Sequence, residues 1–176
     1  MPAKFVNSSI DSIPSDHQLT RLAERLAGKL AAPPLTIATA ESCTGGWVAQ
    51  TLTAIAGSSA WFERGFVTYS NQAKQEMLGV AGETLQQYGA VSEQVVQEMA
   101  QGVLNHSPAQ LAVSVSGIAG PGGGSVEKPV GTVWFGWCRQ GSDVHCEHKQ
   151  FNGDRDAVRR QAVAHALQGL IDLAGS

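Results

Sequence analysis

The chain of 176 residues is long enough to form one domain with a hydrophobic core and short for two. Its composition, 43% hydrophobic and 15% charged, excludes disorder over most of its length. The formal net charge is −3 and no run of Lys or Arg is present, which argues against a broad surface for nucleic acid or anionic membrane.

The first expected helix begins at a capping box, in which Ser15 is followed three residues later by Gln18, and it ends before Pro33-Pro34. Residues 1–14 show no periodicity, so we expect a flexible N-terminal arm followed by one domain over 15–176. The periodicity next predicts a strand at 35–40, a helix at 46–56, a strand at 65–70 and short helices at 71–78 and 82–89.

In the second half of the chain, Ser92 caps a helix whose apolar positions run from Val95 to Leu104. A strand is expected at 111–116, strands at 132–138 and 143–151 form a hairpin, and Asp154 caps the last helix. Strands and helices alternate until this hairpin. The pattern predicts an α/β fold, a single three-layer α/β/α domain with a mixed, mainly parallel sheet.

The three cysteines Cys43, Cys138 and Cys146 are odd in number and lack C-x-x-C spacing, so reduced thiols are the simplest interpretation. No signal peptide and no apolar run of membrane-spanning length is found. We therefore expect a cytoplasmic protein that binds neither membrane nor nucleic acid. The "HCEH" at 145–148 divides its side chains between two strand faces and is a poor metal site, so no metal is expected.

Two strand ends are chemically unusual: "ATAESCTGG" at 38–46 and "SVSGIAGPGGGS" at 114–125. In open α/β sheets, ligands bind beyond the carboxyl ends of the strands. Glycines there let backbone N–H groups approach a phosphate or an oxyanion closely, although neither loop matches a standard nucleotide fingerprint. The alternative is that the hydroxyl residues are helix caps and the glycines serve turns.

Ser42, Cys43 and Thr44 each carry a side chain that could act as a nucleophile, a phosphate contact or a helix cap. Cys43 would need a basic partner, and no histidine lies in a motif that could supply one. A serine can use a desolvated lysine, and Lys74 with Tyr69 in "FVTYSNQAK" is expected at the same sheet edge as Ser42. Alternatively, Lys74 is a solvated helix lysine and Tyr69 an amphipathic strand-end residue.

The segments "TIATAESCTGGWVAQTLTAIAGSSAWFERGFVTYSNQAKQEMLGV", "YGAVSEQVV", "SVSGIAGPGGGSVEKPVGTVWFGW" and "FNGDRDAVRRQAVAHAL" closely resemble the CinA C-terminal domain family. The resemblance covers about residues 15–174, and the combination of "AESCTGG" with "SGIAGP.GG" is highly specific to that family. It implies an amidohydrolase that converts nicotinamide mononucleotide (NMN) to nicotinate mononucleotide and ammonia. It also implies a homodimer or larger assembly, for which Trp61 and Phe62 are either interface or core residues.

By this resemblance, Ser42 matches the family's nucleophile, Tyr69 and Lys74 match its tyrosine and lysine, and Ser116 occupies a hydroxyl position that is Thr in many relatives. The substrate phosphate is expected to bind Arg155 or Arg159, and both remain candidates. The full set of expected substrate-binding residues is Thr44, Gly45, Gly46, Gly117, Gly120, Gly122, Gly123, Arg155 and Arg159.

The sequence thus favours a serine amidohydrolase in which Lys74, with Tyr69 as a relay or orienting group, takes the proton of Ser42. Backbone N–H groups after Ser42 or in the "GIAGPGG" loop would stabilise the oxyanion, assisted by Ser116. This scheme requires no cofactor. The alternative is a non-catalytic nucleotide-binding module of the same fold that uses both loops as phosphate cradles. A cysteine hydrolase using Cys43 is a weaker third hypothesis.

Overall fold

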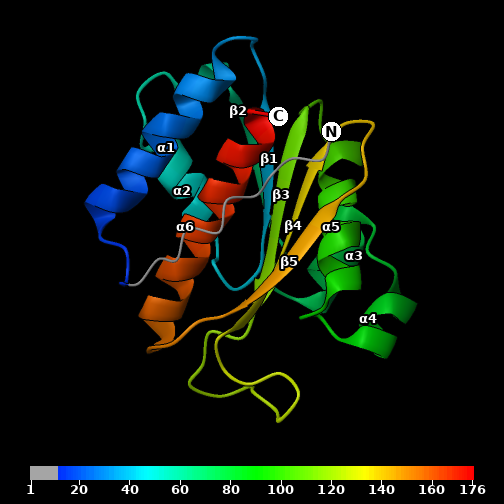
Figure 1. Cartoon of the computed structure of the whole chain (residues 1–176). Coiled ribbons are helices and arrows are strands. Elements are labelled where there is room, and N and C mark those ends of the chain that lie inside the picture. The colour runs from blue at the N-terminus through cyan, green and yellow to red at the C-terminus, as the bar shows by residue number, and fades with distance from the viewer. Residues whose placement is uncertain (1–11) are drawn as a thin grey trace.

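Five strands form one sheet between two layers of helices in the computed structural model, which describes residues 12–176 (Figure 1). Most of the expected N-terminal arm, residues 1–11, lies outside the described residues. The elements are α1 (Asp16–Leu30), β1 (Ile37–Glu41), α2 (Trp47–Thr53), a 3₁₀ turn (Ser58–Ala60), β2 (Phe62–Val67), α3 (Asn71–Leu78), α4 (Gly82–Tyr88), α5 (Glu93–Asn105), β3 (Leu111–Gly117), β4 (Thr132–Arg139), β5 (His145–Gln150) and α6 (Arg155–Ala174).

The strands are arranged in the order β2-β1-β3-β4-β5. β1 pairs in parallel with β2 and with β3, whereas β3–β4 and β4–β5 are antiparallel. β5 therefore runs in the direction of β3, and only β4 opposes the other strands. The predicted mixed sheet and its terminal hairpin are confirmed, with the parallel pairing confined to the first three strands.

The helices cover the two faces of this sheet in two groups (Figure 1). α1, α2 and α6 pack on one face and share a core with residues such as Leu26, Val113 and Leu167. α3, α4 and α5 lie on the other face, around Met99 and Val103. β1 is buried at every position. A strand that is covered on both faces lacks the alternation of apolar and polar residues that is typical of a half-exposed strand.

The predicted helix caps form as expected. Ser15 and Gln18 make a complete capping box, because each side chain bonds the backbone of the other residue. Ser92 accepts from Val95 N at 3.4 Å, and Asp154 accepts from Ala157 N at 2.9 Å. These caps place the starts of α1, α5 and α6 at the residues that the sequence indicates.

The second strand differs most from its prediction, since β2 spans Phe62–Val67 rather than 65–70. Glu63, Arg64 and Gly65 do not resemble an apolar strand, but β2 is an edge strand that pairs only with β1. At its other end the chain leaves the sheet because Ser70 becomes the N-cap of α3 and accepts from Ala73 N at 3.0 Å.

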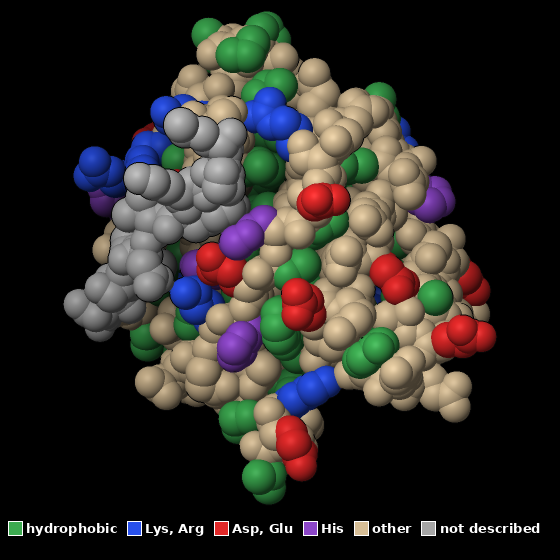
Figure 2. All heavy atoms as spheres, turned by 45° about the vertical axis from the view of Figure 1, so that its right-hand side comes forward, with side chains coloured by type: hydrophobic (Ala, Val, Ile, Leu, Met, Phe, Trp, Pro, Cys, Tyr) green, Lys and Arg blue, Asp and Glu red, His purple; other side chains and the backbone are tan. Residues whose placement is uncertain are grey.

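The carboxyl ends of β1, β2 and β3 meet at one edge of the sheet, at the lower end of Figure 1. The loop 118–131 between β3 and β4 protrudes from this edge, and Figure 2 shows a hydrophobic side chain at its tip. Val126 in this loop is 95% exposed. Within residues 12–176, none of the helices has the length and apolar character needed to cross a membrane.

Candidate active site

Ser42 lies directly after β1, in the turn that leads into α2. Its backbone N–H donates to Val115 O on the neighbouring strand β3 at 3.0 Å, which ties the turn to the sheet. The side chain is 9% exposed and opens into a cavity of about 220 Å³ at the carboxyl edge. That cavity is lined by Ser42, Cys43, Tyr69, Asn71, Lys74, Ala90, Val91, Ser116, Gly117, Ala119 and Arg155.

Lys74 approaches Ser42 from α3 on the opposite side of this cavity. Its Nζ donates to Ser42 Oγ at 3.0 Å and to the Thr68 carbonyl at 2.8 Å, and the residue is 1% exposed. Lys74 forms no ion pair with any carboxylate in residues 12–176. Burial therefore lowers the pKa of Lys74, because little around the ammonium replaces its lost hydration. A lysine of this kind can be neutral and accept a proton from a serine hydroxyl.

Cys43 is next to Ser42, and its thiol is held in the protonated form. Burial, and after it the charge of Glu41, raise the pKa of the Cys43 thiol to about 12. The cavity contains no histidine that could accept the thiol proton. A thiol that stays protonated is a poor nucleophile, so the geometry favours Ser42 over Cys43.

Tyr69 and Arg155 form a second pair at the mouth of the same cavity. Arg155 Nη2 donates to Tyr69 Oη at 3.0 Å, and Nη1 donates to the Gly120 carbonyl at 2.8 Å. Tyr69 is 60% exposed, and its hydroxyl bonds Arg155 rather than Ser42 or Lys74. Ser116 also lines the cavity, but its hydroxyl donates to Ala90 O at 2.7 Å.

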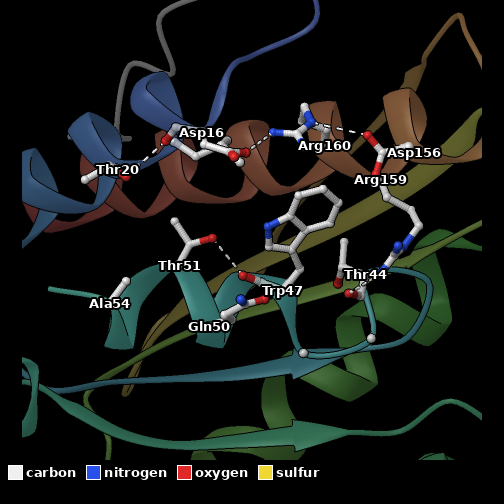
Figure 3. Close-up of a pocket in the computed structure, with 13 residues that line it drawn as sticks. Asp16, Thr20, Thr44, Trp47, Gln50, Thr51, Ala54, Asp156, Arg159 and Arg160 are labelled. Carbon is white, nitrogen blue, oxygen red and sulfur yellow. Dashed lines mark hydrogen bonds and ion pairs between the residues drawn. The ribbon is translucent and has the colours of Figure 1, made fainter.

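Of the remaining predicted residues, only Gly117 lines the Ser42 cavity. Thr44, Gly45, Gly46 and Arg159 line a larger hollow of about 580 Å³ between α1, α2 and α6, drawn in Figure 3. Gly122 and Gly123, in the protruding loop, line neither of these two hollows. The expected site residues are thus divided by the turn that carries Ser42.

Glu41 is a residue of this site to which the sequence interpretation gave no role. Its buried carboxylate accepts from Thr44 Oγ1 at 2.6 Å and from the N–H groups of Gly46, Val48 and Ala49 at 2.8–3.1 Å. A carboxylate placed before a helix N-terminus satisfies the free N–H groups and the helix dipole, and this signal was present in the sequence. The N–H groups at the start of α2 are therefore already bonded to the Glu41 carboxylate.

The "HCEH" segment lies away from this cavity, on β5. Glu147 contacts His145 and, from α6, His165, both at 3.1 Å. In the part of the chain that the structure describes, no group of three or more His, Cys, Asp or Glu side chains is arranged to hold a metal ion.

A three-layer α/β/α domain with a buried serine–lysine pair at the carboxyl edge of its sheet defines a class of candidate hydrolases. The chain belongs to the CinA C-terminal domain family, whose model matches residues 19–174. The resemblance identified from the motifs is thereby confirmed.

Curated relatives cover nearly the whole chain. It is 61% identical to the nicotinamide-nucleotide amidohydrolase PncC of Escherichia coli strain K12, over 89% of this chain and 94% of the relative. It is 54% identical to the protein of that name from Pseudomonas putida, over 88% and 96% of the two chains.

Among solved structures, the competence/damage inducible protein CihA of Agrobacterium tumefaciens superposes with a TM-score of 0.88 at 46% identity. The match covers 94% of this chain and 99% of that one. This neighbour confirms the fold class independently of the motifs.

Proposed function

We propose that the chain is a nicotinamide-nucleotide amidohydrolase that converts NMN and water to nicotinate mononucleotide and ammonia. Relatives that carry this name and share more than half of their residues with the chain support the reaction. The observation that carries the mechanism is the 3.0 Å contact between Lys74 Nζ and Ser42 Oγ inside a cavity. It supplies a nucleophile with its base and requires no metal or cofactor.

In the first half of the reaction, neutral Lys74 takes the proton of Ser42 as Oγ attacks the carboxamide carbon. The resulting oxyanion is stabilised by backbone N–H groups at the Ser42 turn. When the tetrahedral intermediate collapses, the C–N bond breaks and Lys74 returns the proton to the departing nitrogen. Ammonia leaves, and the nicotinoyl group remains as an ester on Ser42.

In the second half, a water molecule attacks the ester carbonyl while Lys74, again neutral, accepts one of its protons. Collapse of the second tetrahedral intermediate breaks the bond to Ser42 Oγ, which regains a proton from Lys74. The product leaves as the nicotinate carboxylate. Tyr69 and Ser116 line the reacting cavity, and we assign them to orienting the substrate within it.

We assign recognition of the substrate phosphate to Arg155 rather than Arg159. Arg155 lines the cavity that holds Ser42, whereas Arg159 lines the hollow on the other side of the turn. A guanidinium binds phosphate through charge-assisted and often bidentate hydrogen bonds. Its present partners, Tyr69 Oη and the Gly120 carbonyl, fix its position at the mouth of the cavity.

We also propose a cytoplasmic homodimer or larger assembly. Trp61 is buried in the core and Phe62 packs against it, so these two residues do not form an exposed interface patch. Large hydrophobic side chains are instead exposed at Val67, Met77 and Tyr88. Light scattering on the purified chain tests this proposal, and a monomeric mass at micromolar concentration would contradict it.

Release of ammonia from NMN by the purified chain tests the reaction itself. We expect stoichiometric ammonia and nicotinate mononucleotide, without added metal and in the presence of a chelator. Binding of NMN without any ammonia release would instead support the alternative of a non-catalytic nucleotide-binding module.

A further inference from the structure

Arg159 lies on α6, about one turn beyond Arg155, and contacts the back of the turn that carries Ser42. Its Nε donates to the Cys43 carbonyl at 3.1 Å and its Nη2 donates to the Thr44 carbonyl at 3.2 Å. The guanidinium also lies over the Trp47 ring, 5.2 Å from the ring centroid. Figure 3 shows this side chain reaching from α6 to the turn at Thr44. Arg159 thus holds two consecutive peptide groups, Cys43–Thr44 and Thr44–Gly45, that follow the first peptide group after Ser42.

Most N–H groups of the same turn are already used within the protein. Between residues 42 and 49, the N–H groups that have acceptors are those of Ser42, Gly45, Gly46, Trp47, Val48 and Ala49. The N–H groups of Cys43 and Thr44 have no acceptor in any other described residue. Buried backbone donors are rarely left unpaired, so these two groups are available to a ligand.

The contacts of Arg159 fix the orientation of one of these free donors, the Thr44 N–H. The Cys43 N–H shares its peptide unit with the Ser42 carbonyl, which accepts from Gly45 N at 3.0 Å. In a planar trans peptide, the C=O and N–H of one unit point in opposite directions. Since the Cys43 carbonyl faces Arg159, the Thr44 N–H of the same unit points away from Arg159. Cys43 itself lines the cavity that holds Ser42.

We propose that Arg159 is a positioning residue for the oxyanion hole. By holding the Cys43 carbonyl, it keeps the free Thr44 N–H of the same peptide unit aimed, beside the Cys43 N–H, at the carboxamide oxygen as negative charge develops there. This inference rests on the deamidation proposed above. It also removes Arg159 from the candidates for phosphate binding, because its guanidinium is committed to the turn.

The test compares Arg159→Met and Arg159→Lys with the unmodified chain, using NMN and nicotinamide riboside as substrates. Losing one oxyanion donor typically costs about 10²–10³ in kcat, so we expect loosened donors to lower kcat about ten- to a hundredfold. KM for NMN should change by less than about twofold, since ground-state binding is retained. The preference for NMN over the riboside should remain, because the phosphate contact is intact.

Arg159→Lys keeps the charge but cannot hold two carbonyls in the fork geometry of a guanidinium, so its kcat should fall as well. It also provides a folded variant if Arg159→Met does not fold. Arg160→Met is the matched control: Arg160 lies over the same Trp47 ring, 4.9 Å from the centroid, but pairs with Asp16 and Asp156. Its kcat should equal that of the unmodified chain.

A thioamide analogue of NMN separates the oxyanion role from a general loss of structure. Sulfur accepts hydrogen bonds poorly, so the unmodified enzyme should have a much lower kcat for the thioamide than for NMN. In the Arg159 variants this ratio of kcat values should be smaller. Equal discrimination in all three proteins, or a rise in KM confined to NMN with normal kcat, would overturn the inference while leaving the deamidase proposal intact. An unmodified chain that releases no ammonia from NMN would overturn both.

Discussion

Residues 41–46 and residues 118–131 leave the same edge of the sheet, and both are rich in glycine. The first segment is buried from Glu41 to Thr44 and is held by the Glu41 carboxylate on one side and Arg159 on the other. The second is tied at its base by Ile118 and Gly131, and two side chains, Arg155 and Lys128, make further contacts between it and the rest of the protein. It protrudes from the sheet, and Val126 is 95% exposed.

Two segments of similar glycine content can therefore have different roles. Buried charged side chains with several hydrogen bonds hold a backbone in one conformation, as a preorganised oxyanion site requires. A protruding loop with an exposed tip can adjust to a ligand, as the rim of a binding site requires. We therefore expect substitutions in the first segment to change chemistry and those in the second to change it little.

The largest effect is expected at Ser42 itself. Ser42→Ala removes the proposed nucleophile, so deamidation of NMN should fall by several orders of magnitude while the melting temperature stays near that of the unmodified protein. Cys43→Ala should retain most activity, because the Cys43 thiol, with a pKa of about 12, remains protonated. Ammonia release by the two variants measures this contrast, and an inactive Cys43→Ala beside an active Ser42→Ala would reverse the assignment.

The next largest effect is expected at Lys74, which must be neutral to accept a proton. Its lowered pKa means that the neutral fraction rises as pH increases through a value below about 10.4, the ordinary lysine pKa. The kcat/KM for NMN should rise with pH over this range, measured above pH 7, where the substrate phosphate is already fully ionised.

Lys74→Arg keeps a cation but cannot supply a base, since arginine stays protonated. It should lose about 10²–10⁴ in kcat, the usual contribution of a general base. A Lys74→Arg enzyme with near-normal kcat, or a rate that falls as pH rises above 7, would remove Lys74 from the mechanism.

A smaller effect is expected at Arg155, where the proposed phosphate contact is lost together with the hydrogen bonds to Tyr69 Oη and the Gly120 carbonyl. Hydrogen bonds to charged groups contribute about 1.5–3 kcal/mol, and 1.4 kcal/mol is about tenfold, so Arg155→Gln should lower kcat/KM for NMN about ten- to a hundredfold. The riboside, which lacks the phosphate, should be affected much less. Similar kcat/KM values for NMN and the riboside in the unmodified enzyme would refute phosphate recognition.

Local signals made part of this site predictable. Ser42 and Lys74 follow the adjacent parallel strands β1 and β2, so their meeting at one sheet edge could be expected from the order of the elements. The contacts of Arg159 could not be predicted, because they join residues 116 and 115 positions apart and depend on how α6 packs beside the turn. The start of β2 was missed for a different reason, since Glu63 and Arg64 are tolerated on an edge strand.

One substitution in each of the two loops, compared for stability and activity, tests whether the loops have these different roles. Glu41→Gln keeps the size of the side chain but replaces a charged acceptor that faces the N–H groups of Gly46, Val48 and Ala49. The loss should be about 2 kcal/mol, which corresponds to a fall of about 4–8 °C in Tm for a chain of this size.

Val126→Ser, in the protruding loop, should leave both Tm and kcat unchanged, because a side chain exposed at 95% gains almost nothing from burial. Thermal unfolding and NMN turnover of the two variants measure the contrast. The decisive quantity is kcat of Glu41→Gln well below its melting temperature, where the fold is fully populated. A reduced kcat there would mean that Glu41 holds the turn in its reactive geometry, as its four hydrogen bonds suggest. An unchanged kcat with a lowered Tm would restrict Glu41 to stabilising α2, and the reactive geometry would then depend on Arg159 alone.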